Sequence, residues 1–149
     1  IKKQKKEIDL ISIGNKYYSK YSNTRSIYNN VKSINILKKT VIESSEHMFN
    51  IMIKKNIKSK CTMDIYLKDF QDILFCSLNF EYRTLSFNNN YKNDKGILIK
   101  LFIDSNYLNA ILEKKSHWNN AIISFNLEWE RDPNIFDRGW YDSLNYLHK

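Results

Sequence analysis

The side chains best suited to chemistry gather in one stretch, Ser116 to Pro133, which reads SHWNNAIISFNLEWERDP. It begins with a polar and aromatic cluster made of His117, Trp118, Asn119 and Asn120. Adjacent amides after a tryptophan can satisfy the backbone groups of a loop and fix the start of a strand, or they can line a polar pocket. We favour the structural role and retain the four residues as candidates for contact with a ligand or partner.

Two carboxylates, Glu128 and Glu130, follow the cluster two positions apart, on one face of the strand expected there. Paired carboxylates can perform general acid–base work. Alternate acids on a strand are more often its solvated side, which is the interpretation we adopt. Arg131 falls on the apolar side at the end of the strand, where Asp132 or Asp137 could form an ordinary surface salt bridge with it. Glu128 and Arg131 therefore join the contact candidates.

The remaining searches for catalytic or metal-binding motifs find little. The three glycines of the chain cannot build the usual phosphate loop. His47, His117 and His148 are far apart in sequence and form no zinc-ligand pair. Cys61 and Cys76 have no neighbouring histidine and no Cys-x-x-Cys spacing, so we interpret them as buried, reduced thiols of a cytoplasmic protein. We expect no metal and no cofactor in this chain.

The net charge of +8 originates in the first part of the chain. Residues 1–60 carry 14 Lys and Arg against 4 Asp and Glu, whereas residues 61–149 carry 10 against 12. Lys38, Lys39, Lys54 and Lys55 form the candidate basic patch of this part. Such a patch could contact phosphates. Only four basic residues are arginine, which weakens that interpretation, and the Lys/Asn/Ile bias is what an AT-rich genome would impose.

Hydrophobic periodicity predicts the elements that hold these residues. Apolar residues at helical spacing between residues 24 and 57 predict a long helix or helix pair, capped at Asn23-Thr24. After Lys60, the segments CTMDIYLKDF, DILFCSLNF, EYRTLSF and GILIKLFI read as strands. The loop NNNYKNDKG is the strongest turn signal, and we expect the strands on either side of it to pair as an antiparallel hairpin.

The last part of the chain is expected to hold two short helices and one more strand. Asp104-Ser105 caps the first helix and Asp137 the second. Between them, the alternation of Ile123, Phe125, Leu127 and Trp129 predicts a single strand. The order favours one α+β domain over residues 1–149, with a mostly antiparallel sheet of about five strands covered by helices. No apolar run reaches the length of a membrane span.

Three parts of the sequence resemble the C-terminal end of a family of large enzymes. They are HWNNA at His117 to Ala121, the strand LEWERDP with Arg131 and Pro133, and the closing YDSLNYLH with Leu147-His148. This pattern looks like the end of the metallo-β-lactamase-fold hydroxylases and hydrolases related to CMP-N-acetylneuraminate hydroxylase. The similarity covers about the last 50 residues. The order of elements around it also looks like a sterol-carrier-protein-2-type sheet.

The resemblance implies a non-catalytic C-terminal accessory domain that caps or shapes a substrate site or mediates dimerisation. The family's His-x-His-x-Asp-His cluster and the Cys-x-His pairs of a Rieske iron–sulfur centre are absent from these residues. A metal or iron–sulfur centre would then belong to an upstream catalytic domain of the same polypeptide. Because the chain begins at Ile1 rather than Met, we expect it to be a fragment of a longer protein.

Two other functions stay open at this stage. The amphipathic sheet and the aromatic content of 14% suit a small carrier of apolar, lipid-like ligands. The excess of lysine in residues 1–60 suits a module that binds nucleic acid or an acidic partner. We expect nucleic acid to be the less favoured partner, while a homodimer is compatible with the sequence.

Overall fold

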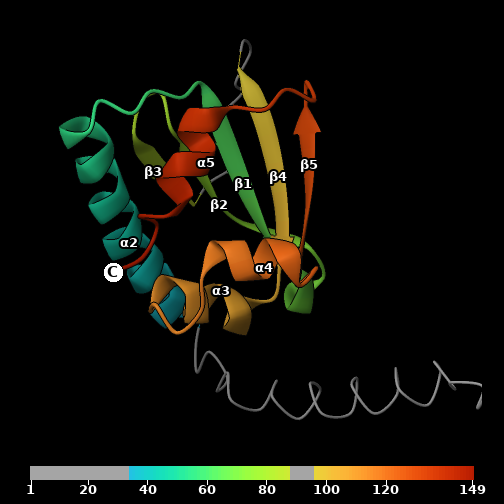
Figure 1. Ribbon diagram of the computed structural model, residues 1–149. Coiled ribbons are helices and arrows are strands. Elements are labelled where there is room, and N and C mark those ends of the chain that lie inside the picture. The colour runs from blue at the N-terminus through green and yellow to red at the C-terminus, as the bar shows by residue number, and fades with distance from the viewer. Residues whose placement is uncertain (1–33, 88–95) are drawn as a thin grey trace, which may run out of the picture. The chain divides into compact units, whose positions relative to one another are not determined.

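The computed structural model describes residues 34–87 and 96–149 (Figure 1). The elements are the long helix α2 (Ile34–Lys54), the strands β1 (Cys61–Leu67), β2 (Ile73–Asn79), β3 (Thr84–Ser86) and β4 (Ile97–Ile103), the helices α3 (Ser105–Leu112) and α4 (Trp118–Ile123), the strand β5 (Leu127–Asp132), and the helix α5 (Arg138–Leu144). A short 3-10 turn, Lys68–Phe70, follows β1. The protein is an α+β domain, as predicted. The expected cap at Asn23-Thr24 lies outside the described residues.

The five strands form one mixed sheet in the order β3-β2-β1-β4-β5. Neighbouring strands are antiparallel except β1 and β4, which run parallel with Met63 opposite Ile99. At one edge, β5 pairs with β4 and places Trp129 opposite Leu101. The predicted number of strands and their mostly antiparallel arrangement are confirmed.

The predicted hairpin across NNNYKNDKG is wrong. β3 pairs with β2, whereas β4 pairs with β1 and β5, so two strands separate the expected partners. The apolar run of β4 buries Ile99, Leu101 and Ile103 in the interior of the sheet, where a strand needs a neighbour on each side. β3 is only three residues long and offers little surface for such pairing. A turn signal marks the end of a strand, but it selects neither the partner nor the direction of the next strand, and β3 and β4 run in the same direction.

Helices α2 and α5 cover one face of the sheet (Figure 1). The alternation predicted for β1 holds, because Met63, Ile65 and Leu67 are buried while Tyr66 is half-buried on the opposite face. Helix α5 is fastened by Trp140, whose Nε1 donates to Met63 Sδ at 3.4 Å. This helix-covered face forms the core, and at one edge of the sheet α4 contacts β5.

The stretch expected to be one strand is instead a helix followed by a shorter strand. Ile123 and Phe125 were expected on a buried face, yet they are 75% and 90% exposed. Helix α4 begins at the cap His117, whose Nδ1 accepts a hydrogen bond from the Asn119 amide at 3.2 Å. It ends in two backbone hydrogen bonds that cap its C-terminus. The Phe125 amide donates to the Ile122 carbonyl, and the Asn126 amide donates to the Ala121 carbonyl. Only Leu127 to Asp132 remains extended.

Candidate binding pocket at the C-terminal end

A hollow of about 430 Å³ opens on the surface between α3, the start of α4 and the C-terminal residues. Its polar lining comes from His117, Asn120, Asn145, His148, Lys114 and Lys115. The buried residues Trp118 and Leu147 also line it. We call this hollow the C-terminal pocket. It contains three of the four residues that the sequence singled out between His117 and Asn120.

Two segments far apart in sequence build the pocket. Trp118 Nε1 donates to the carbonyl oxygen of Leu147 at 3.4 Å, across 29 positions. The backbone amide of Lys149 donates to Leu112 O at 2.9 Å, which holds the last residues against the end of α3. Two of the three parts of the sequence resemblance, at His117 to Ala121 and at Leu147-His148, are therefore in contact.

Asn119 takes no part in lining the pocket. Its side-chain oxygen accepts a hydrogen bond of 3.2 Å from the hydroxyl of Tyr141 on α5. This contact joins α4 to α5, so Asn119 has a structural role in the described residues. Asn120, the next residue, lines the pocket.

The pKa of the His148 imidazole in the pocket is lowered. Burial lowers its pKa below the ordinary value of 6.5, and the nearby Lys114 and His47 act in the same direction. The rings of His47 and His148 lie 5.2 Å apart. Nδ1 of His148 is buried and has no hydrogen-bond partner among the described residues.

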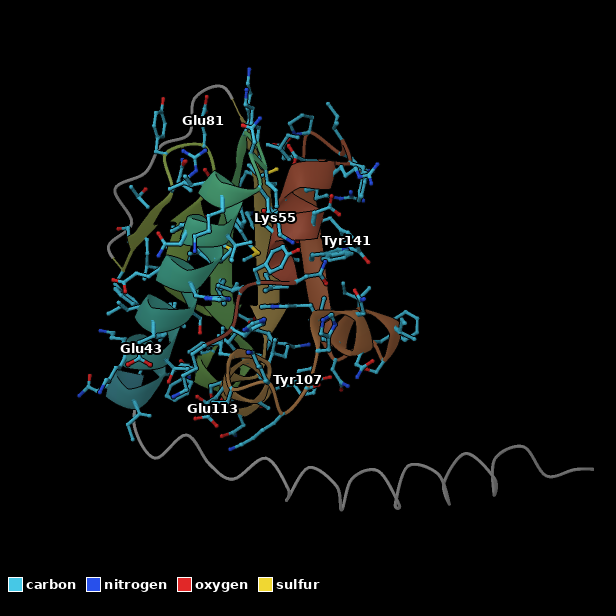
Figure 2. All side chains as sticks on the ribbon, turned by 60° about the vertical axis from the view of Figure 1, so that its left-hand side comes forward. Glu43, Lys55, Glu81, Tyr107, Glu113 and Tyr141 are labelled. Atoms are coloured by element: carbon cyan, nitrogen blue, oxygen red, sulfur yellow. The ribbon has the colours of Figure 1, made fainter. Side chains whose placement is uncertain are left out.

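Positive charge gathers around the pocket and is partly balanced by glutamates. Lys115 Nζ lies 2.7 Å from Glu113, and this pair is the first cause of the lowered pKa of that carboxyl. Lys149 lies 3.9 Å from both Glu113, which caps the C-terminal end of α3, and Glu43 on the neighbouring helix α2 (Figure 2). Lys114 lines the pocket without an ion pair among the described residues. The pocket thus offers ammonium, imidazole and amide groups, which suit a polar or anionic group.

The other strand candidates lie outside this pocket. Glu128 forms an ion pair with Lys68, and Glu130 lies 3.5 Å from Lys100. Both glutamates are largely exposed, which is the arrangement of a solvated strand face. Arg131 lies opposite Ile99 and is half-buried. It makes no ion pair with any residue that the structure describes.

The four lysines of the candidate basic patch lie in two pairs near opposite ends of α2. Sixteen positions separate Lys38 from Lys54, about 24 Å along a helix. Lys38 Nζ lies 5.4 Å from the ring centroid of Phe87, and Lys55 Nζ donates to the Tyr146 hydroxyl at 2.7 Å. Lys39 lies 4.0 Å from Glu43. The structure does not bring the four ammonium groups together into one surface.

Three general properties of the described residues complete the site. No group of three or more His, Cys, Asp or Glu side chains stands in a position to hold a metal ion. None of the helices there has both the length and the apolar character needed to cross a membrane. Cys61 and Cys76 are free and buried.

Comparisons of the chain with family models, curated proteins and solved structures give no match.

Sequence reasoning found one side of the C-terminal pocket and missed the other. His117, Trp118 and Asn120 were named as candidates, whereas Asn145 and the two lysines were not. Leu147-His148 belongs to the resemblance and carries no binding signal of its own. The spacing of these residues in the sequence does not predict that they are in contact. Trp118 and Leu147 are 29 positions apart, and only the tertiary fold brings them together.

Proposed function

We propose that this chain is a non-catalytic C-terminal accessory domain of a metal-dependent hydroxylase or hydrolase. In this role the C-terminal pocket caps or shapes the substrate site of an upstream catalytic domain in the same polypeptide. The observation that carries the proposal is the contact between Trp118 and Leu147, which brings two of the three parts of the resemblance into one pocket wall.

The chemistry of the pocket supports binding and orientation of a substrate. Asn120 and Asn145 supply amide donors and acceptors, and the imidazole of His148 also lines the pocket. Lys114 adds a cation that can attract a carboxylate or phosphate. Groups of this kind hold a polar substrate in place, while the bond-breaking step takes place at the metal of the upstream domain.

The first test is the reading frame upstream of Ile1. The proposal expects an upstream domain that carries a His-x-His-x-Asp-His cluster. An upstream domain without such a metal motif, or a reading frame that starts at Ile1, contradicts it.

The second test uses the full-length protein. Replacing Asn120 with alanine removes a hydrogen bond worth about 1–1.5 kcal/mol, and the KM should rise roughly tenfold with a smaller change in kcat. Asn134→Ala is the matched control, because Asn134 is exposed and lies outside the pocket lining. Equal KM values for the two variants, at equal thermal stability, would argue against the pocket as part of the substrate site.

A further inference from the structure

We propose that the free edge of β5 binds an extended, basic segment of another polypeptide by strand addition. This inference concerns a surface distinct from the C-terminal pocket and does not rest on the proposed function. Among the described residues β5 pairs only with β4, so its outer backbone groups are open to a further strand.

A hollow of about 490 Å³ lies beside β5, and Phe102 of β4 and Ile122 of α4 share its lining. Leu127 and Trp129 line it from the helix-covered face, while Glu128 and Glu130 line it from the opposite face. Residues from both faces of β5 therefore border one hollow. Phe125 adds an apolar wall at one end. The edge therefore has room and apolar surface beside its unpaired backbone.

Phe125 lowers the stability of the protein in the absence of a partner. Its side chain is 90% exposed and its φ is +54°, in the left-handed region where a helix normally ends with glycine. A bulky residue held in that conformation is a genuine outlier, and such outliers cluster at functional sites. The neighbouring Ile123 is also 75% exposed. A partner that covers Phe125 would account for the apolar surface that this side chain exposes.

The negative charge of Glu128 and Glu130 favours a basic strand over a second copy of this chain as the partner of β5. Two copies paired edge to edge through β5 would be related by a twofold axis perpendicular to the sheet, which keeps equivalent faces together. Glu128 would then meet Glu130 or its own counterpart, and like charges directly opposite one another are destabilising. A strand with Lys or Arg on that face and apolar residues on the other matches Glu128 and Glu130 as well as Leu127 and Trp129.

The two glutamates remain accessible to such a partner. Their pairs with Lys68 and Lys100 are surface pairs, with the carboxylate side chains 69% and 67% exposed. Pairs of this kind are weak and exchange readily for another cation. The chain as a whole carries a net charge of +8, so nonspecific attraction does not favour a cationic peptide. A cationic peptide would therefore bind through direct contact with Glu128 and Glu130.

The test is a titration of the full chain with a capped peptide of alternating lysine and valine, six residues long like β5. Nuclear magnetic resonance follows the indole signals, and the Trp129 signal should move more than that of Trp118. A glutamate–valine peptide should not bind. The double variant Glu128→Gln, Glu130→Gln should weaken binding at least tenfold, whereas Lys68→Gln, Lys100→Gln should strengthen it.

The variant Phe125→Gly should change stability and peptide affinity in opposite directions. Glycine relieves the left-handed backbone, so the midpoint of thermal unfolding should rise while affinity for the lysine–valine peptide falls several-fold. Ile73→Ala is the control, because Ile73 is 61% exposed on β2 and lies away from the hollow. Equal binding of both peptides, unchanged binding in the glutamine variants, self-association in sedimentation, or displacement of the peptide by a fatty acid would each overturn the proposal.

Discussion

Trp118 Nε1 donates a hydrogen bond to the carbonyl oxygen of Leu147 at 3.4 Å, and both residues are almost completely buried. A buried carbonyl depends on such a donor, because no water reaches it. The bond joins the first residue of α4 to the last residues of the chain. It thereby fixes the wall of the C-terminal pocket.

Trp118→Phe removes this donor and keeps an aromatic ring. Leaving the Leu147 carbonyl without its partner should lower the free energy of unfolding by about 1–3 kcal/mol. Denaturant unfolding measures the change. Phe136→Leu is the control, because Phe136 is 61% exposed and its substitution should cost little. If the two variants unfold at the same denaturant concentration, the hydrogen bond contributes nothing measurable.

Gly139→Ala should destabilise the junction between α5 and the segment before β1. A Cβ at Gly139 would stand 1.9 Å from the backbone oxygen of Lys58, so the backbone must shift to admit it. Overpacking of this kind costs about 1–3 kcal/mol or more, which outweighs the helix propensity gained from alanine. Arg138→Ala, one position earlier on an exposed side chain, serves as the control. Thermal unfolding of Gly139→Ala at or above that of the wild-type protein would refute the close approach.

Local signals in the sequence predicted much of the fold. The period-two pattern of β1 put Met63 and Ile65 on the buried face, as the structure confirms. Asp104 caps α3 by accepting from Asn106 N at 2.9 Å, and Asp137 caps α5 by accepting from Trp140 N at 2.7 Å. These features depend on residues within a few positions of one another, so their chemistry is visible in the sequence.

Features that depend on tertiary contacts were missed. The alternation from Ile123 to Trp129 outweighed a helical signal, the i, i+3, i+4 spacing of Trp118, Ala121 and Ile122. Helix α4 has only six residues, so its pattern is short and its stability comes from packing of Trp118 and Ala121. The parallel pairing of β4 with β1 and the meeting of Trp118 with Leu147 are equally non-local.

The two cysteines should be unreactive in the folded protein. Burial raises the pKa of Cys61 to about 12 and raises that of Cys76 further, so almost no thiolate exists at pH 8. A disulfide reagent such as Ellman's should label neither thiol rapidly under native conditions and both in denaturant. Serine at one position at a time identifies which thiol is labelled. Rapid labelling of a native thiol would show that its strand opens or that its burial is incomplete.

The stability of the domain should fall in mild acid because of His148. Its pKa is lowered in the folded state, so the unfolded chain binds its proton more readily, and stability declines as the pH falls below 6.5. The carboxyl of Glu113 is separate from this window. Its lowered pKa supplies stability that is present above 4.5 and is lost only as the pH falls below that value. Unfolding measured between about pH 7.5 and pH 5.5 therefore isolates the histidine contribution.

His148→Asn keeps a polar side chain that does not titrate. The variant should lose less stability than the wild-type protein between the same two pH values, and the difference is the contribution of the imidazole. The ring signals of His148 in a magnetic resonance titration give its midpoint directly, and they should place it below 6.5. A midpoint at or above that value would mean that a hydrogen-bonding partner, and not burial beside Lys114 and His47, controls the ring.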